Sequence, residues 1–156
     1  MTIDDMAAYG LDRMSDDELR DFVSNQKMGV LGLPTAGAPY MLPMSFGYDG
    51  GSTLYFTFVG GPDSRKRTLI DDADTARFLT YAAQSMFNWE SAILTGSVQS
   101  VPEAEWDALE AVLGTAWRPE VFERATAVED IAIYRFDVDD WSGIKHTGLP
   151  PGFDTA

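Results

Sequence analysis

The sequence predicts a mainly β, α+β fold: an antiparallel β-barrel with peripheral helices. Six or seven segments have the composition of strands, and turn residues separate most of them. Helical patterns occur near the start, in the middle and late in the chain, so no helical crossover follows each strand as a parallel sheet requires. With 156 residues and 45% hydrophobic composition, we expect a single domain over residues 1–156.

Residues 1–38 predict an arm, a helix, a strand and a turn. Residues 1–14 have little pattern and are expected to form an N-terminal arm. Ser15-Asp16-Asp17-Glu18 has the form of a capping box, in which the Glu18 side chain reaches back to the Ser15 backbone. It begins an amphipathic helix that ends near Asn25 and has three inward positions: Leu19, Phe22 and Val23. A strand over residues 28–33 and a turn over residues 34–38 follow.

The stretch from Pro39 to Leu69 predicts a hairpin, a glycine loop and the start of a helix. Apolar side chains at every second position from Tyr40 to Tyr48 indicate a strand with one packed face. Asp49-Gly50-Gly51 supplies a tight turn, and residues 54–58 return as an aromatic strand. After two further glycines, Ser64 is a suitable N-cap for a helix that begins at Arg65.

Three consecutive cations, Arg65, Lys66 and Arg67, therefore fall on the first turn of that helix. The positive end of a helix dipole favours Asp or Glu by about 0.3–1 kcal/mol each, so cations are unfavourable there in isolation. They become favourable when an anion lies among them, held by the side chains and by free backbone N–H groups. The alternative is that they neutralise neighbouring carboxylates in a very acidic chain. We favour the anion site.

The rest of the chain continues the strand pattern and adds one substantial helix. Gly96 is expected to mark a bulge or a close approach of backbones, and Trp106 is expected to pack in the core. The predicted segments are a strand over residues 75–81, a polar loop over 83–90 with Phe87 and Trp89, a strand over 91–101, a helix from Pro102 to Leu113, a helical turn over 119–124, a strand over 131–138, a further edge strand over 140–146, and a tail over 147–156.

Composition excludes several classes of function. There are 25 acidic and 11 basic residues, giving a net charge of −14, so the general field repels nucleic acid and anionic membranes. Adaptation to high salt, that is, a halophilic protein, would explain this charge. No apolar segment has the length of a transmembrane helix or the form of a signal peptide, so we expect a cytoplasmic protein.

The chain has no cysteine and one histidine, which excludes thiol chemistry and ordinary zinc or iron–sulfur sites. No loop has the ligand spacing of a calcium or magnesium site, so no metal site is expected. His146 is interpreted as an exposed histidine near the tail. Redox chemistry in such a chain would need a bound cofactor that the protein positions.

In their order along the chain, these elements resemble the pyridoxamine 5′-phosphate oxidase-like family of FMN-binding split β-barrel proteins. The resemblance covers roughly Ser15 to Ser100, and four motifs at suitable spacing carry it: Pro43-Met44-Ser45, Asp49-Gly50-Gly51, Tyr55-Phe56-Thr57 and Ser64-Arg65-Lys66. It implies a split barrel of six to seven strands and a homodimer with FMN bound in clefts between the subunits.

The resemblance also implies which residues bind the cofactor. Ser64, Arg65 and Lys66 would hold the phosphate, which agrees with the anion site argued from charge. The other implied contacts are the strand backbone at Pro43, Met44 and Ser45 along the flavin ring, Thr57 on the ribityl or phosphate side, Trp89 and Ser91 near the ring, and Trp141 or Lys145 reaching over from the partner subunit. Trp89 and Trp141 could equally anchor a dimer interface.

The sequence departs from true pyridoxamine phosphate oxidases because its C-terminal part lacks their Arg-x-His substrate motif. It is more similar to the small subgroup that includes nitroimidazole-resistance reductases. We therefore expect an FMN-dependent oxidoreductase that transfers hydride from NAD(P)H to a small acceptor. The alternative is a binding module for a flavin, a deazaflavin or haem with little turnover.

Overall fold

The computed structural model describes residues 1–116, 131–149 and 152. Its strands are β1 (Leu11–Arg13), β2 (Met28–Leu33), β3 (Tyr40–Ser45), β4 (Gly47–Tyr48), β5 (Thr53–Val59), β6 (Ala76–Ser85), β7 (Asn88–Ser100) and β8 (Ile131–Thr147). Its helices are α1 (Asp16–Asn25), α2 (Arg65–Asp72), α3 (Glu110–Leu113) and the 3-10 segments η1 (Asp4–Tyr9), η2 (Glu103–Glu105) and η3 (Asp107–Leu109). In this part of the chain, no helix is long and apolar enough to cross a membrane.

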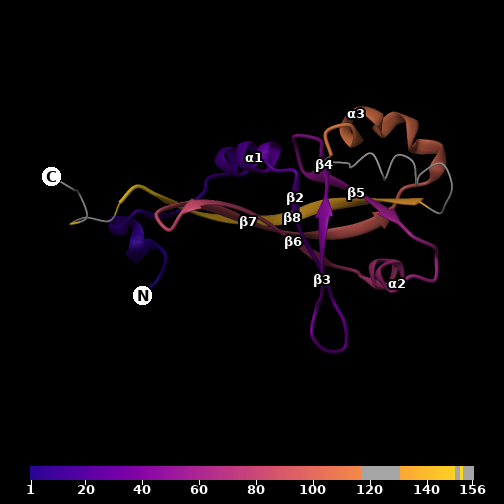
Figure 1. The fold of residues 1–156 in the computed structure, drawn as a ribbon, viewed down its shortest axis with the longest axis horizontal. Helices are drawn as coiled ribbons and strands as arrows, with labels where there is room; N and C mark the ends of the chain where they lie inside the picture. The colour runs from indigo at the N-terminus through magenta and orange to yellow at the C-terminus, as the bar shows by residue number, and fades with distance from the viewer. Residues whose placement is uncertain (117–130, 150–151, 153–156) are drawn as a thin grey trace.

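The eight strands form one antiparallel sheet in the order β3-β2-β6-β7-β8-β5-β4, with β1 paired to β8 (Figure 1). Because β3 and β4 are consecutive in the chain but lie at opposite ends of this order, the sheet curls round on itself. Among the described residues, no ladder joins β3 to β4 or β5, so the barrel stays split there. The expected antiparallel split barrel is confirmed.

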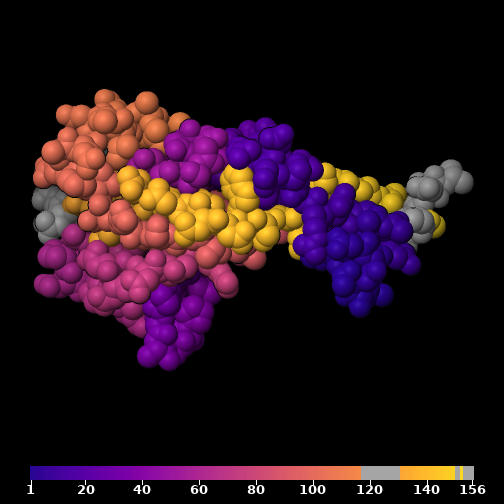
Figure 2. Space-filling view, turned by 180° about the vertical axis from the view of Figure 1, so that it is seen from behind, coloured from indigo at the N-terminus to yellow at the C-terminus, as the bar shows by residue number. Residues whose placement is uncertain are grey.

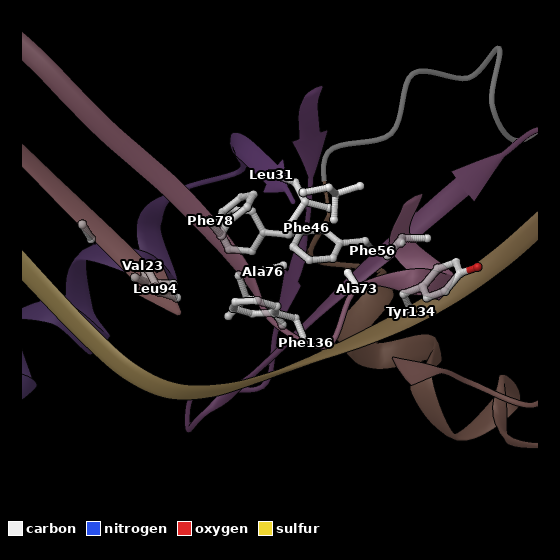
Figure 3. Close-up of a cluster of buried hydrophobic side chains, with 14 of the residues drawn as sticks. Val23, Leu31, Phe46, Phe56, Ala73, Ala76, Phe78, Leu94, Tyr134 and Phe136 are labelled. Carbon is white, nitrogen blue, oxygen red and sulfur yellow. The ribbon is translucent and has the colours of Figure 1, made fainter. Parts of the chain in front are cut away.

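The core of the barrel is a cluster of aromatic rings from four segments of the chain (Figure 3). Phe78 of β6 contacts Phe46 and Phe56, with ring centroids 5.1 Å and 5.2 Å away, and Phe136 of β8 lies against Phe56. Alternation along β5 places Leu54, Phe56 and Phe58 inside and leaves the residues between them partly exposed. Burial of these rings holds the curled sheet together.

Helix α1 begins where the sequence predicts it. Ser15 Oγ accepts from the Glu18 backbone N–H at 3.2 Å, and the Ser15 backbone N–H donates to Glu18 at 3.3 Å, which completes the capping box. The three predicted inward residues are all buried, so α1 covers one face of β7 and β8.

The segment from Tyr40 to Tyr48 is two strands, whereas the sequence analysis predicted one. β3 pairs with β2, and only the two residues of β4 pair with β5. Phe46, between them, turns into the core and ends the first ladder. Of the predicted hairpin, only the turn and the short β4–β5 ladder are therefore present, and Gly50 in the turn has a φ of 84°. The alternation itself is correct, because Tyr40, Leu42 and Met44 pack against the core.

Several predicted boundaries after residue 80 are wrong. The polar loop is a tight connection, since β6 extends to Ser85 and β7 begins at Asn88, which places Trp89 in a strand. The two last predicted strands are one strand, β8, and it is not at an edge because β7 and either β5 or β1 flank it. Figure 2 shows the N-terminal residues (indigo) against the far part of β8 (yellow).

Three smaller predictions have mixed outcomes. The N-terminal arm contains η1 and β1, and Met14 is buried, so it belongs to the fold. The helix predicted from Pro102 is mostly 3-10 helix, and Trp106 is only half-buried, with Nε1 donating to the Val101 carbonyl at 3.0 Å. The bulge is confirmed, because the β7–β8 register shifts at Gly96. The helical turn predicted over 119–124 lies outside the described residues.

Candidate functional site at the split of the barrel

Helix α2 follows the loop after β5 and lies beside β3 (Figure 1). The Arg65 guanidinium stacks 5.1 Å from the centroid of the Tyr40 ring at the start of β3. Lys66 Nζ donates to the Val59 carbonyl at the end of β5, at 2.7 Å. Ile70 is buried in the core and fixes the helix against the barrel. The predicted helix start thus connects the two strands that border the split.

Ser64 is the N-cap residue, as predicted, but its hydroxyl does not cap the helix. The Ser64 carbonyl accepts from the backbone N–H groups of Arg67 and Thr68, both at 3.1 Å, whereas its Oγ makes no cap hydrogen bond. Ser64 Oγ is buried and has no partner among the described residues. A buried hydroxyl without a partner costs roughly 1–3 kcal/mol, so a site of this kind is completed by a ligand or by water.

The polar side chains of this turn converge on Gly60. A side chain at position 60 would begin 3.5 Å from Lys66 Cε and 3.8 Å from Ser64 Oγ, and Arg67 Nη1 donates to the Gly60 carbonyl at 3.3 Å. The φ of Gly60 is 141°, which side-chain-bearing residues rarely adopt. The glycine therefore lets the loop run close beneath three donor side chains.

The three cations of α2 have no carboxylate within 4.0 Å in the part of the chain that the structure describes. The ion pairs there are Arg13–Asp4, Arg20–Asp17, Arg135–Asp137 and Lys145–Glu18. Asp71, one turn beyond Arg67, accepts instead from the Tyr134 hydroxyl at 2.6 Å. Burial raises the pKa of Tyr134, and this hydrogen bond raises it further. The geometry favours an anion site over neutralisation of neighbouring carboxylates.

Pro43, Met44, Ser45 and Thr57 lie on the strands that border this split. Met44 packs against the core, so Pro43 and Ser45 face the other side of β3. Thr57 likewise faces away from the core, because its neighbours Phe56 and Phe58 are buried. β3 is paired on one side only, and the β4 ladder reaches no further along β5 than Tyr55. Among the described residues, the edge of β3 at the split therefore has no ladder partner.

The remaining four predicted residues lie on two opposite faces of the sheet. Trp89 and Ser91 alternate with the buried Ala92 and Leu94 and share the outer face of β7. Trp141 and Lys145 are on the α1 side of β8. Trp141 Nε1 donates to Asp16 at 3.0 Å, and Lys145 forms its ion pair with Glu18. The structure therefore does not bring these two residues together with the first two, and their cofactor roles stay predictions.

His146 differs from the expected tail histidine. It lies within β8, opposite Leu11 and Trp89, and its ring centroid is 6.2 Å from that of Trp89. Its Nδ1 is 3.0 Å from the Phe87 carbonyl oxygen, which can only accept, so Nδ1 carries the proton. The alternation over residues 140–146 pointed to a strand, but its partner β1 has no pattern that the sequence analysis could use.

Sequence reasoning also missed an apolar depression of about 470 Å³ on the outer face of β2, β3, β6 and β7. Its lining includes Val30, Met41, Leu79, Ile93 and Arg77. Met41 is 63% exposed and Ile93 46%, and Tyr81, next along β6, is 63% exposed. Every second residue of β6 and β7 faces this side, and this alternation is present in the sequence. The correct strand boundaries were needed to show that these apolar residues share one outer face.

A family model described as pyridoxamine 5′-phosphate oxidase matches residues 15–145. The chain belongs to this family. The match spans most of the chain and includes the four motifs on which the resemblance was based. Comparison with curated protein sequences finds no match.

Three solved structures have the same fold as this member of the pyridoxamine 5′-phosphate oxidase family, although their sequences are only 15–20% identical to it. A FAD-binding protein from Mesorhizobium loti is 15% identical, with a TM-score of 0.71 over 88% of this chain and 98% of its own. A putative 5-nitroimidazole antibiotic resistance protein from Bacteroides thetaiotaomicron is 19% identical, with a TM-score of 0.64 over 87% and 89%. A FAD and haem binding protein from Mycobacterium smegmatis is 20% identical, with a TM-score of 0.67 over 94% and 77%. At these identities the likeness shows the fold alone.

Proposed function

We propose that this chain binds FMN at the first turn of α2 and is an FMN-dependent oxidoreductase that passes hydride from a nicotinamide donor to a small electron-poor acceptor. The observation that carries the proposal is the group of donors around Gly60: a buried, unpartnered Ser64 hydroxyl beside Lys66 and Arg67, with no ion pair between an α2 cation and a carboxylate among the described residues. This donor set fits a phosphate.

In this proposal, Ser64, Arg65 and Lys66 hold the phosphate. The ammonium of Lys66 has three donors and gives one of them to Val59, so two remain for a ligand. The β3 edge at Pro43, Met44 and Ser45, together with Thr57, holds the remainder of the flavin. Bound FMN supplies reversible hydride and electron transfer, which the side chains of this chain do not supply. The contribution of the protein is to bind, orient and shield it.

The phosphate contact is tested by comparing FMN with riboflavin, which has the same ring system and no phosphate. Each charge-assisted hydrogen bond contributes roughly 1.5–3 kcal/mol. We expect Arg65→Ala with Lys66→Ala to weaken FMN at least 100-fold and to leave riboflavin nearly unchanged, as measured by quenching of flavin fluorescence. Arg13→Ala with Arg20→Ala removes two exposed cations elsewhere and is the matched control. Equal loss of both ligands would mean that the α2 cations serve only the fold.

Turnover is tested on the protein as purified. A yellow protein that NAD(P)H bleaches, and that a small acceptor such as a nitroaromatic compound re-oxidises, supports the oxidoreductase. A coloured protein that neither nicotinamide reduces supports the second candidate, a binding module for a flavin, a deazaflavin or haem. This second candidate is favoured by the similar fold of the Mycobacterium smegmatis protein, which binds FAD and haem.

We also propose that the chain is a homodimer, joined through the outer face of β2, β3, β6 and β7. Met41, Tyr81 and Ile93 are large exposed side chains on this face, and the depression beside them is lined mainly by apolar residues. An exposed apolar patch of this kind is typical of a protein interface. A second copy supplies a self-complementary cover for it.

Light scattering in 1 M salt checks the dimer. We expect the mass of two chains, and we expect Ile93→Asp to give a monomer because it places a carboxylate at the centre of the apolar face. The control is Gln99→Asp, which changes an exposed residue near the other end of the same strand. A wild-type monomer at micromolar concentration contradicts the proposal.

A further inference from the structure

We infer that Arg67, the third cation of α2, is a phosphate-binding residue and that it acts with Ser64 as the preorganised part of the site. The inference rests on the proposed function and adds a residue to it.

Arg67 and Ser64 both belong to the first turn of α2. Ser64 is the N-cap and Arg67 the third residue of the helix, two positions whose side chains lie on the same side of the first turn, as they do in a capping box. Both side chains reach Gly60: Ser64 Oγ lies 3.8 Å from the point where a residue-60 side chain would begin, and Arg67 Nη1 donates to the Gly60 carbonyl at 3.3 Å.

Ser64 and Arg67 carry the buried side-chain atoms that lack hydrogen-bond partners among the described residues, namely Ser64 Oγ and Arg67 Nε. One is a hydroxyl and the other a charged N–H, and a phosphate oxygen is an acceptor for both. The coincidence of two unmet donors at one helix start is unusual, because buried polar groups are nearly always paired. In our proposal, one anion accepts from both.

The three cations of α2 differ in exposure and in the groups that hold them. Arg65 is exposed, and its guanidinium lies over the Tyr40 ring. Lys66 and Arg67 are half-buried, and each is held by a backbone carbonyl of the Val59–Gly60 loop. A charge held in place with little surrounding water interacts more strongly with an anion than an exposed one does. Asp71 and Arg67 both contact the Tyr134 hydroxyl, to which Asp71 is the acceptor, but no ion pair joins Asp71 to Arg67 among the described residues.

The planar fork of arginine makes the inference testable. Arg67→Lys keeps the charge but removes the Nε donor and the geometry that holds the side chain on Gly60. We expect this variant to weaken FMN at least tenfold without changing riboflavin affinity. Arg13→Lys, the matched control at an exposed arginine of β1 outside the proposed site, should change FMN affinity less than threefold. Ser64→Ala should weaken FMN about fivefold, and its effect should not add to that of Arg67→Lys because both act on one anion.

Two measurements on the apoprotein decide the outcome: dissociation constants for FMN and riboflavin, and the shift in thermal midpoint caused by inorganic phosphate. Wild-type protein that binds both flavins equally overturns the proposed function itself. Wild-type protein that prefers FMN, with Arg67→Lys no weaker in FMN binding than Arg13→Lys, overturns this inference alone. If Arg67→Lys fails to fold, Ser64→Ala decides: loss of FMN affinity and of the phosphate-induced shift supports the inference, and no change in either overturns it.

Discussion

Glu18 has two roles that are separable by a single substitution. Its carboxylate completes the capping box of α1 and also forms the ion pair with Lys145, which ties α1 to β8. The hydrogen bond from Lys145 lowers the pKa of Glu18, and the same contact raises the pKa of Lys145. Gln at position 18 can keep the capping box, because Glu and Gln both serve at that position, but it loses the charge.

We therefore expect Glu18→Gln to reduce the free energy of unfolding at pH 7 by a few tenths of a kcal/mol and at most about 1 kcal/mol, since the pair is partly exposed. Because the folded pKa of Glu18 is lowered, this stabilisation is present above the unfolded pKa and disappears as the pH falls through the folded pKa. Urea unfolding of both proteins at pH 7 and at pH 2.5 checks this. A difference that persists unchanged at low pH would assign the effect to capping.

At the residue scale, prediction from sequence succeeds where the signal is local. The capping box at Ser15 and the helix start at Ser64 were both found, because each depends on residues within one turn. The Ser64 hydroxyl and Arg67 Nε could not be recognised as unpartnered from sequence. Their lack of partners depends on the path of the Val59–Gly60 loop, which only the folded chain defines.

Gly96 sets the shape of the long β7–β8 pair. The register between these strands shifts at Gly96, and a side chain there would overlap the carbonyl oxygen of Asp137. The bulge lets β7 and β8 stay paired along their whole length, from the barrel, where β8 also pairs with β5, to the part where β8 pairs with β1.

We expect Gly96→Ala to lower the free energy of unfolding by about 2–4 kcal/mol, the range of substitutions that force buried backbone to move. Gly32→Ala in β2 is the control, because its new side chain meets only the Arg77 carbonyl at an ordinary 3.6 Å. Guanidinium unfolding monitored by tryptophan fluorescence measures both. Equal effects of the two substitutions would mean that the bulge tolerates a side chain.

At the element scale, the sequence predicted which segments are strands better than it predicted their partners. The alternation from Tyr40 to Tyr48 correctly gave the packed side, but it could not show that β3 pairs with β2 and β4 with β5. Likewise, β8 was divided in two because Asp139 and Asp140 interrupt its apolar pattern. In both cases the strand bounds depend on which distant segments pair with one another, and a single sequence carries little information on that pairing.

The net charge of −14 acts on the whole molecule. At low ionic strength the carboxylates repel one another in the compact state, which destabilises it. At 1 M salt the screening length is about 3 Å, so this long-range repulsion disappears while close pairs such as Lys145–Glu18 remain.

We expect the thermal midpoint to rise steadily from 10 mM to 1 M sodium chloride in scanning calorimetry. Sorbitol at matched osmolarity controls for a general solute effect, and it should raise the midpoint less than the salt does. A flat or falling midpoint in sodium chloride would remove the basis for a halophilic interpretation.

The length of β8 has a consequence for the order in which the protein is assembled during synthesis. The β2–β3 and β6–β7 hairpins join neighbouring segments and can form as soon as both strands have left the ribosome. By contrast, β1 and β5 pair with β8, which is made long after either of them. A nascent chain therefore carries the aromatic strand β5 with an unpaired edge until residues 131–147 emerge, and this interval is when the chain is most exposed to aggregation and to chaperones.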